Sequence, residues 1–415
     1  MENKIERCLQ CKTKPCKTGC PLHNDITEMI HYLKEGKEKE AYESMSKTTV
    51  LGSLCGRICP QQKQCEGKCI RGIKGEPVAI GEIEAFLFDK AIDEKWYLER
   101  KNSDVLKGKK VAVVGSGPAG LTCAAFLARE GAKITIYEKR EQLGGLLRYG
   151  IPDFRLPKEV LDKTIESIFA LPIEAKTNQE LTKDITIDNL SQEYDAVFLS
   201  FGANISSSIN IPGEDLEGVL GGNELLESGN HPDYTGKKVA IIGGGNVAMD
   251  SARTIKRMGA EEVTIVYRRS REEMPAEEKE IAMAEKEGIQ FSYQTDVREM
   301  LGNKKVEAMK CIRTELIEKE GETRKVPVPI PDSEFTKEVD YVVLAIGSHP
   351  DHMVIEKLDL AKDSYGYIKV DENQMTAKPG VFAGGDIIGT KATVAFAASS
   401  GRKAADKIKE YLQNK

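Results

Sequence analysis

The ten residues VAVVGSGPAG, from Val111 to Gly120, constrain the fold of this chain more than any other stretch. Their apolar first half is typical of a buried parallel strand. Gly115, Gly117 and Gly120 have the spacing G-x-G-x-x-G, and the run after them has helical composition. In a strand–turn–helix unit, such glycines allow a tight turn, let the backbone approach a pyrophosphate and let the helix pack closely on the strand. The stretch therefore predicts the dinucleotide-binding unit of an α/β fold.

The residues that follow complete this unit. A second apolar run, Lys133 to Tyr137, leads directly into Glu138, eighteen residues after Gly120. An acid about 20 residues after the glycines can accept hydrogen bonds from the ribose hydroxyls of a dinucleotide. The alternative, an ordinary glycine-rich turn, accounts for neither the second strand nor the acid.

The same arrangement recurs in the second half of the chain. The apolar run Lys237 to Ile242 leads into GGGNVAMD. Gly243, Gly245 and Ala248 then match the pattern G-x-G-x-x-A. A second dinucleotide-binding unit is expected here.

The second unit carries basic residues where the first carries its acid. The predicted strand Val263 to Tyr267 is followed by Arg268 and Arg269, with Arg271 nearby. Arginine at this position accommodates the 2′-phosphate of NADP, which its planar, permanently charged guanidinium suits. The alternative is that RRSREE is a solvated charged surface. We favour NADPH.

Three more apolar runs predict strands. They are Asp195 to Ser200, Tyr341 to Ile346, and Val381 to Ala383, and Gly384-Gly385-Asp386 follows the last. Thr390 to Ala405 has the small residues and composition of a helix.

Eight of the ten cysteines lie before residue 70 and form two quartets. Their spacings are C-x2-C-x4-C-x3-C, followed by proline, and C-x3-C-x5-C-x3-C. Short spacings of this kind let one loop wrap a [4Fe–4S] cubane, with the fourth thiolate coming from elsewhere. We predict two [4Fe–4S] clusters; structural zinc and a disulfide framework are the alternatives. The quartets are Cys8, Cys11, Cys16 and Cys20, and Cys55, Cys59, Cys65 and Cys69.

We expect the two quartets to interleave, because in two-cluster ferredoxins the fourth cysteine of each run serves the other cluster. The first cluster is then expected on Cys8, Cys11, Cys16 and Cys69, and the second on Cys55, Cys59, Cys65 and Cys20.

The rest of the N-terminal region reads as helices and a linker. Apolar residues at helical spacing predict a helix from Ile26 to Leu33. Further helices are expected over Glu38 to Met45 and Gly81 to Trp96, and a polar linker over Leu98 to Lys110.

The bulk composition excludes several classes of protein. The net charge of −6 is interspersed along the chain, which gives no sign of nucleic-acid binding. No apolar run reaches the roughly 18–20 residues of a membrane span, and the N-terminus has no signal-peptide core. We therefore expect a cytoplasmic protein.

Together these motifs resemble those of a known family. The chain is similar to the small (beta) subunit of glutamate synthase, the flavin subunit of bifurcating ferredoxin:NADP oxidoreductase and the N-terminal flavin portion of dihydropyrimidine dehydrogenase. The resemblance covers nearly the whole chain. It is carried by the two cysteine runs and by CGRICPQQKQCEGKC, GEPVAIG, GGLLRYGIPDFRLPK, GGGNVAMD and VYRRS.

The resemblance implies the domain organisation. It implies an α/β fold with an N-terminal helical iron–sulfur domain and two Rossmann-like domains of the glutathione-reductase type. The expected ranges are 1–103 for the two [4Fe–4S] clusters, 104–235 and 341–415 for the two parts of the FAD domain, and 236–340 for an NADPH domain inserted in it.

The resemblance also assigns the site residues. Arg148 could meet a phosphate or the flavin, or belong to a plain loop. The helix beginning near Thr393 would point its N-terminus at the isoalloxazine. The expected FAD residues are Gly115, Gly117, Pro118, Ala119, Gly120, Glu138, Gly145, Arg148, Gly385, Asp386, Thr393 and Val394. The expected NADPH residues are Gly243, Gly245, Asn246, Val247, Arg268 and Arg269.

The implied activity is electron transfer from NADPH to FAD, to the clusters and to a partner. Hydride transfer between aligned cofactors needs no acid–base residue, and none is predicted. The partner is expected to be a glutamate-synthase-type large subunit or a ferredoxin-like acceptor, giving a hetero-oligomer. A dihydropyrimidine dehydrogenase subunit and a ferredoxin-linked transhydrogenase subunit are the alternatives. An iron–sulfur scaffold or sensor would not need two dinucleotide sites.

Overall fold

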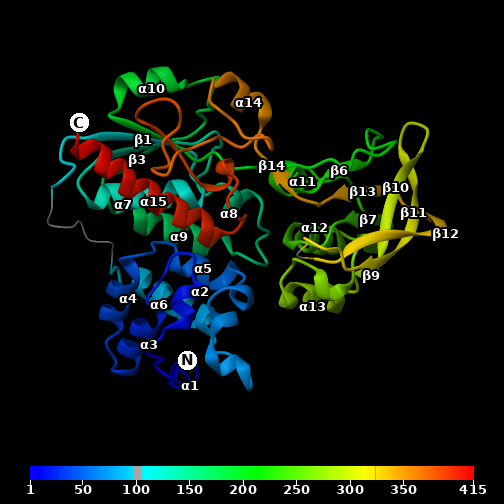
Figure 1. The fold of residues 1–415 in the computed structure, drawn as a ribbon, viewed down its shortest axis with the longest axis horizontal. Helices are drawn as coiled ribbons and strands as arrows, with labels where there is room; N and C mark the ends of the chain where they lie inside the picture. The colour runs from blue at the N-terminus through cyan, green and yellow to red at the C-terminus, as the bar shows by residue number, and fades with distance from the viewer. Residues whose placement is uncertain (97–103, 323) are drawn as a thin grey trace. The chain divides into compact units, whose positions relative to one another are not determined.

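The computed structural model describes residues 1–96, 104–322 and 324–415, and it divides into two compact units. The first comprises Met1–Ala203 and Pro350–Lys415, and the second comprises Asn204–His349 (Figure 1). The second unit is thus an insertion in the chain of the first.

The first unit begins with a bundle of short helices. Asp25 caps one of them by accepting a hydrogen bond from the backbone N–H of Glu28, and the apolar face of that helix is buried. The three helices predicted in this region are confirmed, although the last ends at Asp93 rather than Trp96. The elements are α1 (Glu2–Glu6), α2 (Pro15–Gly19), α3 (Ile26–Lys34), α4 (Glu38–Ser46), α5 (Gly52–Ile58), η1 (Gln61–Lys63), η2 (Glu66–Lys68), η3 (Ile70–Ile73) and α6 (Ile80–Asp93).

The predicted linker, Leu98 to Lys110, can be compared with the structure only in part. Residues 98–103 lie outside the described residues, and Lys110 already begins β1.

A five-stranded parallel sheet forms the second part of this unit, in the order β15-β4-β1-β2-β3. The strands are β1 (Lys110–Val114), β2 (Lys133–Tyr137), β3 (Ile173–Lys176), β4 (Ala196–Leu199) and β15 (Val381–Ala383). The carboxyl ends of parallel strands lie at one edge of a sheet, which brings Gly115, Glu138 and Gly384 to the same edge. The predicted strands of both chain segments are confirmed, and β15 completes the sheet.

Helices surround this sheet, and two of them touch closely (Figure 1). A Cβ added to Gly401 of α15 would lie 2.1 Å from the carbonyl oxygen of Ala119 in α7. Only a glycine permits this approach. The helices are α7 (Pro118–Arg129), α8 (Leu146–Tyr149), α9 (Lys158–Phe169), α10 (Ile187–Glu193), α14 (His352–Lys357), α15 (Val394–Gln413) and η5 (Gly385–Ile388).

The second unit has its own parallel sheet, in the order β6-β13-β7-β8-β9, and an antiparallel sheet, β10-β11-β12. A short antiparallel ribbon, β5 (Ile205–Ser206) with β14 (Ser348–His349), joins the two ends of the unit. The other strands are β6 (Val219–Gly221), β7 (Lys238–Ile242), β8 (Glu262–Tyr267), β9 (Gln290–Tyr293), β10 (Thr295–Gly302), β11 (Val306–Ile317), β12 (Val326–Glu338) and β13 (Tyr341–Leu344). The helices are α11 (Gly222–Ser228), α12 (Asn246–Arg257), η4 (Arg271–Glu273) and α13 (Glu278–Lys286).

The limits of this unit differ from the expected insertion of 236–340. β13, expected in the FAD domain, pairs in parallel with β6 and β7 instead. The Asp340 carboxylate fixes this pairing by accepting a hydrogen bond of 2.8 Å from the backbone N–H of Lys238. An apolar run predicts a strand but not the sheet that the strand joins.

Within the part of the chain that the structure describes, we find no helix with the length and hydropathy needed to span a membrane.

Candidate functional site

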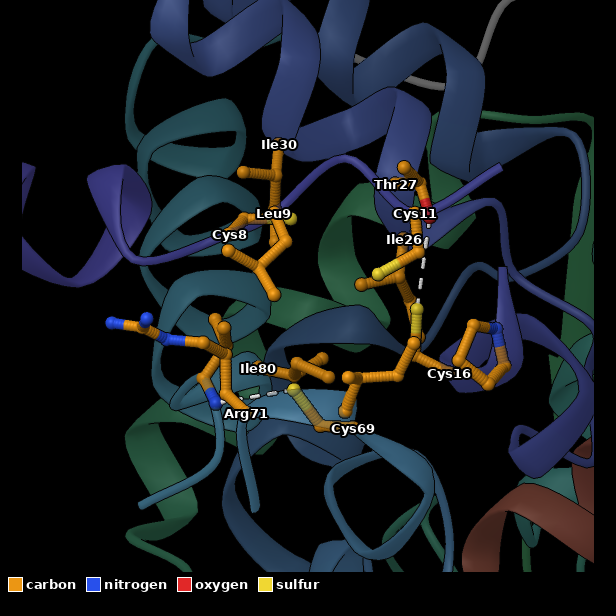
Figure 2. Close-up of a pocket in the computed structure, with 13 residues that line it drawn as sticks. Cys8, Leu9, Cys11, Cys16, Ile26, Thr27, Ile30, Cys69, Arg71 and Ile80 are labelled. Atoms are coloured by element: carbon orange, nitrogen blue, oxygen red, sulfur yellow. Dashed lines mark hydrogen bonds between the residues drawn. The ribbon is translucent and has the colours of Figure 1, made fainter. Parts of the chain in front are cut away.

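Four cysteines from two distant stretches surround one pocket in the helical region (Figure 2). Cys8, Cys11 and Cys16 come from the N-terminal run, and Cys69 is the last cysteine of the second quartet. The remaining lining is mostly apolar and includes Ile26, Ile30, Val78 and Ile80. The structure thus brings together the four cysteines that the interleaved arrangement assigns to the first cluster.

Polar groups near this pocket are directed at sulfur. The backbone N–H of Val78 donates to Cys69 Sγ at 3.5 Å, and the Cys16 Sγ lies 3.7 Å from Thr27 Oγ1. Hydrogen bonds to sulfur tune the potential of an iron–sulfur cluster. Burial raises the pKa of the Cys8 and Cys16 thiols. A metal that binds a thiol favours its thiolate form.

The second set is more deeply buried. Cys20, Cys55, Cys59 and Cys65 are between 3% and 8% exposed. Cys55 and Cys59 share a hydrogen bond, and Cys20 interacts electrostatically with Cys55, Cys59 and Cys65. Burial raises the pKa of Cys20 to about 12. All ten cysteines are free in the structure.

Glu84 of α6 is a residue that the sequence analysis missed. It is 6% exposed, and Asn24 Nδ2 donates to its Oε1 at 3.3 Å. Burial raises the Glu84 pKa to about 8, and its charge acts on Cys20, Cys55 and Cys65. Glu84 is therefore a buried acid that lies beside the second cysteine set. The signal in the sequence is an acid on the apolar face of a predicted helix.

At the first dinucleotide motif, the structure separates the roles of the glycines. A Cβ on Gly120 would lie 2.0 Å from the carbonyl oxygen of Gly115, so Gly120 allows close packing of α7 on β1. A Cβ on Gly117 would meet no atom within 4 Å. The space beside Gly117, at the N-terminus of α7, suits a pyrophosphate. Pro118 and Ala119 follow as the first residues of α7.

Glu138 ties this turn to the next loop. Its Oε2 accepts hydrogen bonds from the backbone N–H of Ser116 at 3.0 Å and from Ser116 Oγ at 2.5 Å. Ser116 Oγ in turn accepts from the backbone N–H of Gly144 at 2.9 Å. A Cβ on Gly145 would lie 3.0 Å from the Cα of Gly117. The acid, the glycine turn and the Gly144-Gly145 loop therefore meet at one place.

Arg148 is engaged elsewhere. Its Nε donates to the carbonyl oxygen of Leu143 at 2.6 Å, and its guanidinium forms an ion pair with Asp162. A phosphate or flavin would have to compete with these partners.

The C-terminal motif reaches the same edge of the sheet. A Cβ on Gly385 would lie 2.9 Å from the Cβ of Ala119 in α7. Thr390 Oγ1 donates to Asp386 at 3.1 Å, and burial raises the Asp386 pKa to about 6. Thr393 caps α15 by accepting from the backbone N–H of Phe396, and Val394 is the first helical residue. This set fits a nucleotide held by the ends of two helices.

The glycine motif of the inserted unit repeats the geometry of the first dinucleotide motif. A Cβ on Gly243 would lie 2.1 Å from the carbonyl oxygen of Ala345, whereas one on Gly245 would meet only Pro275, at 3.9 Å. Asn246 and Val247 begin α12, and Asn246 Oδ1 accepts from the backbone N–H of Glu277 at 3.1 Å. As at Gly117, open space lies at a helix N-terminus.

The arginines after β8 have different surroundings. Arg271 forms ion pairs with Glu278 and Glu285, which raise its pKa. Among the residues that the structure describes, neither Arg268 nor Arg269 forms an ion pair. Arg268 is exposed, and Arg269 Nε donates to the carbonyl oxygen of Lys325 at 3.0 Å.

Arg324, from the β11–β12 hairpin, lies near the end of β8. The sequence analysis did not identify this residue. Its Nη2 donates to Tyr267 Oη at 2.9 Å and to the carbonyl oxygen of Glu273. The ring of Tyr267 lies beside Gly244. Nothing in the sequence near Arg324 connects it to the glycine motif, because the hairpin that carries it was not predicted.

Two family models match the chain. The model for pyridine nucleotide-disulphide oxidoreductases matches residues 109–401, and the model for dihydropyrimidine dehydrogenase domain II, 4Fe-4S cluster, matches residues 1–96. The glutamate synthase [NADPH] small chain of Escherichia coli strain K12 is 37% identical, over 99% of this chain and 91% of its own length. The chain belongs to the glutamate synthase small-chain family. Its members are NADPH-dependent FAD and iron–sulfur oxidoreductases, and the 4Fe-4S match favours clusters over zinc.

A second relative and a solved structure are also similar to the chain. The NADP(+)-dependent formate dehydrogenase subunit beta of Moorella thermoacetica is 38% identical, over 97% of this chain and 60% of its own length. The structure of Mycobacterium tuberculosis FprA in complex with NADPH has a TM-score of 0.66 at 21% identity, covering 74% of this chain and 85% of that one. This likeness shows that the family fold predicted from the sequence is present.

Proposed function

We propose that the chain is the electron-input subunit of a glutamate-synthase-type enzyme. It oxidises NADPH and delivers the electrons to a large catalytic subunit. The observation that carries this proposal is the match to a glutamate synthase small chain over 91% of that chain. The match to the formate dehydrogenase subunit covers only 60% of that subunit, which favours the glutamate synthase assignment.

In this proposal the inserted unit binds NADPH. The open backbone at Gly245 and the first turn of α12, with Asn246 and Val247, receive the pyrophosphate. Arg268 and Arg269 bind the 2′-phosphate. They are available for it because no carboxylate among the described residues neutralises them, and Arg324 adds a third guanidinium nearby.

The first unit binds FAD. Bound FAD would supply the chemistry of accepting a hydride and releasing its electrons singly. Gly117 and the Gly145 loop would receive its pyrophosphate, Glu138 would accept from the ribose, and Asp386 would hold the ribityl and pyrophosphate region. The positive end of α15, which Thr393 caps, is assigned to the flavin ring.

The structure supports an order for the two cysteine sets. Arg402 of α15 donates to the carbonyl oxygens of Leu22, at 2.8 Å, and Thr48, at 3.1 Å, close to Cys20. From Val394 to Arg402 the helix rises about 12 Å. The buried set with Cys20 therefore lies towards the flavin-binding part. The set with Cys8 is half-buried and is assigned to the exit of electrons.

The experiment uses the complete chain with FAD and clusters under anaerobic conditions. We expect NADPH to bleach the flavin absorbance without a partner, and glutamate to form only after a glutamate synthase large subunit is added. Failure of flavin reduction would contradict the oxidoreductase assignment. Flavin reduction without glutamate formation would contradict only the choice of partner, and would favour a pyrimidine reductase or ferredoxin-linked enzyme.

A further inference from the structure

We propose that the chain has a docking surface for an acidic redox protein, formed around the outer cysteine pocket. This inference rests on the proposed function, since it concerns the surface through which the same electrons leave the chain; an acidic ferredoxin serves as a soluble probe of that surface. We name the surface the exit patch; its residues are Arg7, Leu9, Ile70, Arg71, Ile73 and Lys74.

The exit patch contains three aliphatic side chains that face solvent. Leu9 is 55% exposed, Ile70 is 42% exposed and Ile73 is 76% exposed. Single exposed aliphatic residues are common on protein surfaces, but these three line one surface hollow together. A gathered apolar set with a polar rim is typical of a protein contact.

The same residues form the wall of the outer cysteine pocket. Leu9, Ile70 and Arg71 line both the hollow and the pocket that contains Cys8, Cys11, Cys16 and Cys69. Figure 2 shows Leu9 and Arg71 at this pocket. A protein bound on the exit patch would be separated from the first cluster only by these side chains. Proximity of this kind is what electron transfer between two proteins requires.

The charge of the exit patch indicates the kind of partner. Its hollow is lined by three cations, Arg7, Arg71 and Lys74, and by a single acid, Glu76. The whole chain, in contrast, has a net charge of −6. Arg7 donates to the backbone carbonyl oxygen of Glu76 at 2.6 Å, and it forms no ion pair with a carboxylate among the residues that the structure describes. A basic patch on an acidic protein selects an acidic partner and repels basic ones.

We therefore propose that the exit patch binds an acidic redox protein. The surface around its acceptor centre carries a small apolar contact with Asp and Glu residues at its rim. Weak electron-transfer complexes bury under about 1,200 Å² in total, so three aliphatic side chains and three cations are a sufficient centre for such a contact.

The test compares acceptors that need docking with one that does not. The complete chain, loaded with FAD and clusters, is supplied with NADPH and with an acidic ferredoxin, the basic protein cytochrome c, or ferricyanide. The variants are R7E/K74E and I73S. The matched controls are K39E/K47E, which make the same charge change at exposed lysines elsewhere, and Y365S, at a side chain that is 78% exposed.

We expect R7E/K74E to lower kcat/KM for the ferredoxin roughly tenfold at low ionic strength, with the loss shrinking as salt is added. Cytochrome c reduction should not fall, ferricyanide reduction should change less than about twofold, and the iron content should be unchanged. I73S should lower only ferredoxin reduction. Neither control should affect it.

Three results would overturn the proposal while leaving the proposed function intact. The first is ferredoxin reduction that both patch variants leave unchanged. The second is an equal loss in K39E/K47E, which would indicate net charge rather than a surface. The third is a dimer of the chain that R7E/K74E dissociates, which would make a second copy the occupant. If NADPH does not reduce the flavin of the unaltered chain, the proposed function itself fails.

Discussion

Arg268, Arg269 and Arg271 share one short run of sequence but have different neighbours. The carboxylates of Glu278 and Glu285 pair with Arg271, whereas we propose that the other two arginines bind the 2′-phosphate of NADPH. A charge-assisted hydrogen bond contributes about 1.5–3 kcal/mol. Replacing Arg268 and Arg269 with alanine should therefore raise the KM for NADPH roughly ten- to a hundredfold. Steady-state kinetics should show an unchanged KM for NADH.

Arg271→Ala is the matched control for this experiment. It removes two partly exposed ion pairs and should change the KM for either nucleotide by less than about twofold. Equal effects of all three arginines on NADPH and NADH would instead support the solvated-surface interpretation. Arg324→Ala should resemble the loss of one of the first two arginines.

Asp386 gives a prediction for the pH dependence of stability. Burial raises its pKa from 3.8 to about 6, so the folded chain retains a proton that the unfolded chain has already lost. Between these pH values the folded state binds more protons, and the free energy of unfolding must fall as the pH rises. In the FAD-free chain, this contribution should decline by on the order of 2 kcal/mol between about pH 4 and pH 6.

Denaturant unfolding at several pH values checks this expectation. Asp386→Asn should flatten the curve over that interval, and Asp188→Asn, at an exposed position of α10, should not. A slope that persists in Asp386→Asn would assign the titration to another group.

At the scale of elements, the close packing of α7 on α15 requires a glycine at one position. Replacing glycine with alanine inside a helix normally stabilises it by about 1 kcal/mol. At Gly401 the added methyl group would meet the Ala119 carbonyl oxygen at 2.1 Å, and overpacking of this kind costs about 1–3 kcal/mol. Gly401→Ala should therefore lower the midpoint of unfolding, and Lys403→Ala on the exposed side of α15 should not. A raised midpoint in Gly401→Ala would mean that the two helices separate readily.

The elements that could be predicted from the sequence are those with a strong local pattern. β1, β2, β7 and β8 are apolar runs that end at glycine motifs or charged residues. The β10–β12 sheet has no comparable pattern, because its strands are only partly buried and mix polar with apolar residues. β6 has three residues, too few for any periodicity.

The candidate site also divides into residues that could be predicted from the sequence and residues that could not. The glycines and cysteines were predictable because their spacing carries the chemistry. Glu84 and Arg324 were not, since each acts through a contact made by a remote segment. The interleaving of the cysteines was predictable only by analogy with ferredoxins, and the pocket around Cys8 and Cys69 supports it.

For the whole molecule, the interleaved cysteines give a prediction about iron. If Cys69 belongs to the first cluster, Cys69→Ser should halve the iron content and leave the signal of the buried cluster in low-temperature spectroscopy. Cys20→Ser should remove the other cluster and, in addition, slow electron transfer from reduced flavin. Loss of the same cluster in both variants would contradict interleaving. The buried Cys123 provides a control, since Cys123→Ser should retain both clusters.

The ribbon of β5 and β14 has a consequence for how such a protein changes over evolutionary time. Ser206 and Ser348 are paired, so the chain enters and leaves the inserted unit at adjacent points. The 146 residues from Asn204 to His349 can therefore be replaced together, as one domain. If the inserted unit binds NADPH as proposed, a lineage can replace the nucleotide-binding unit, and with it the electron donor, without altering the fold of the first unit.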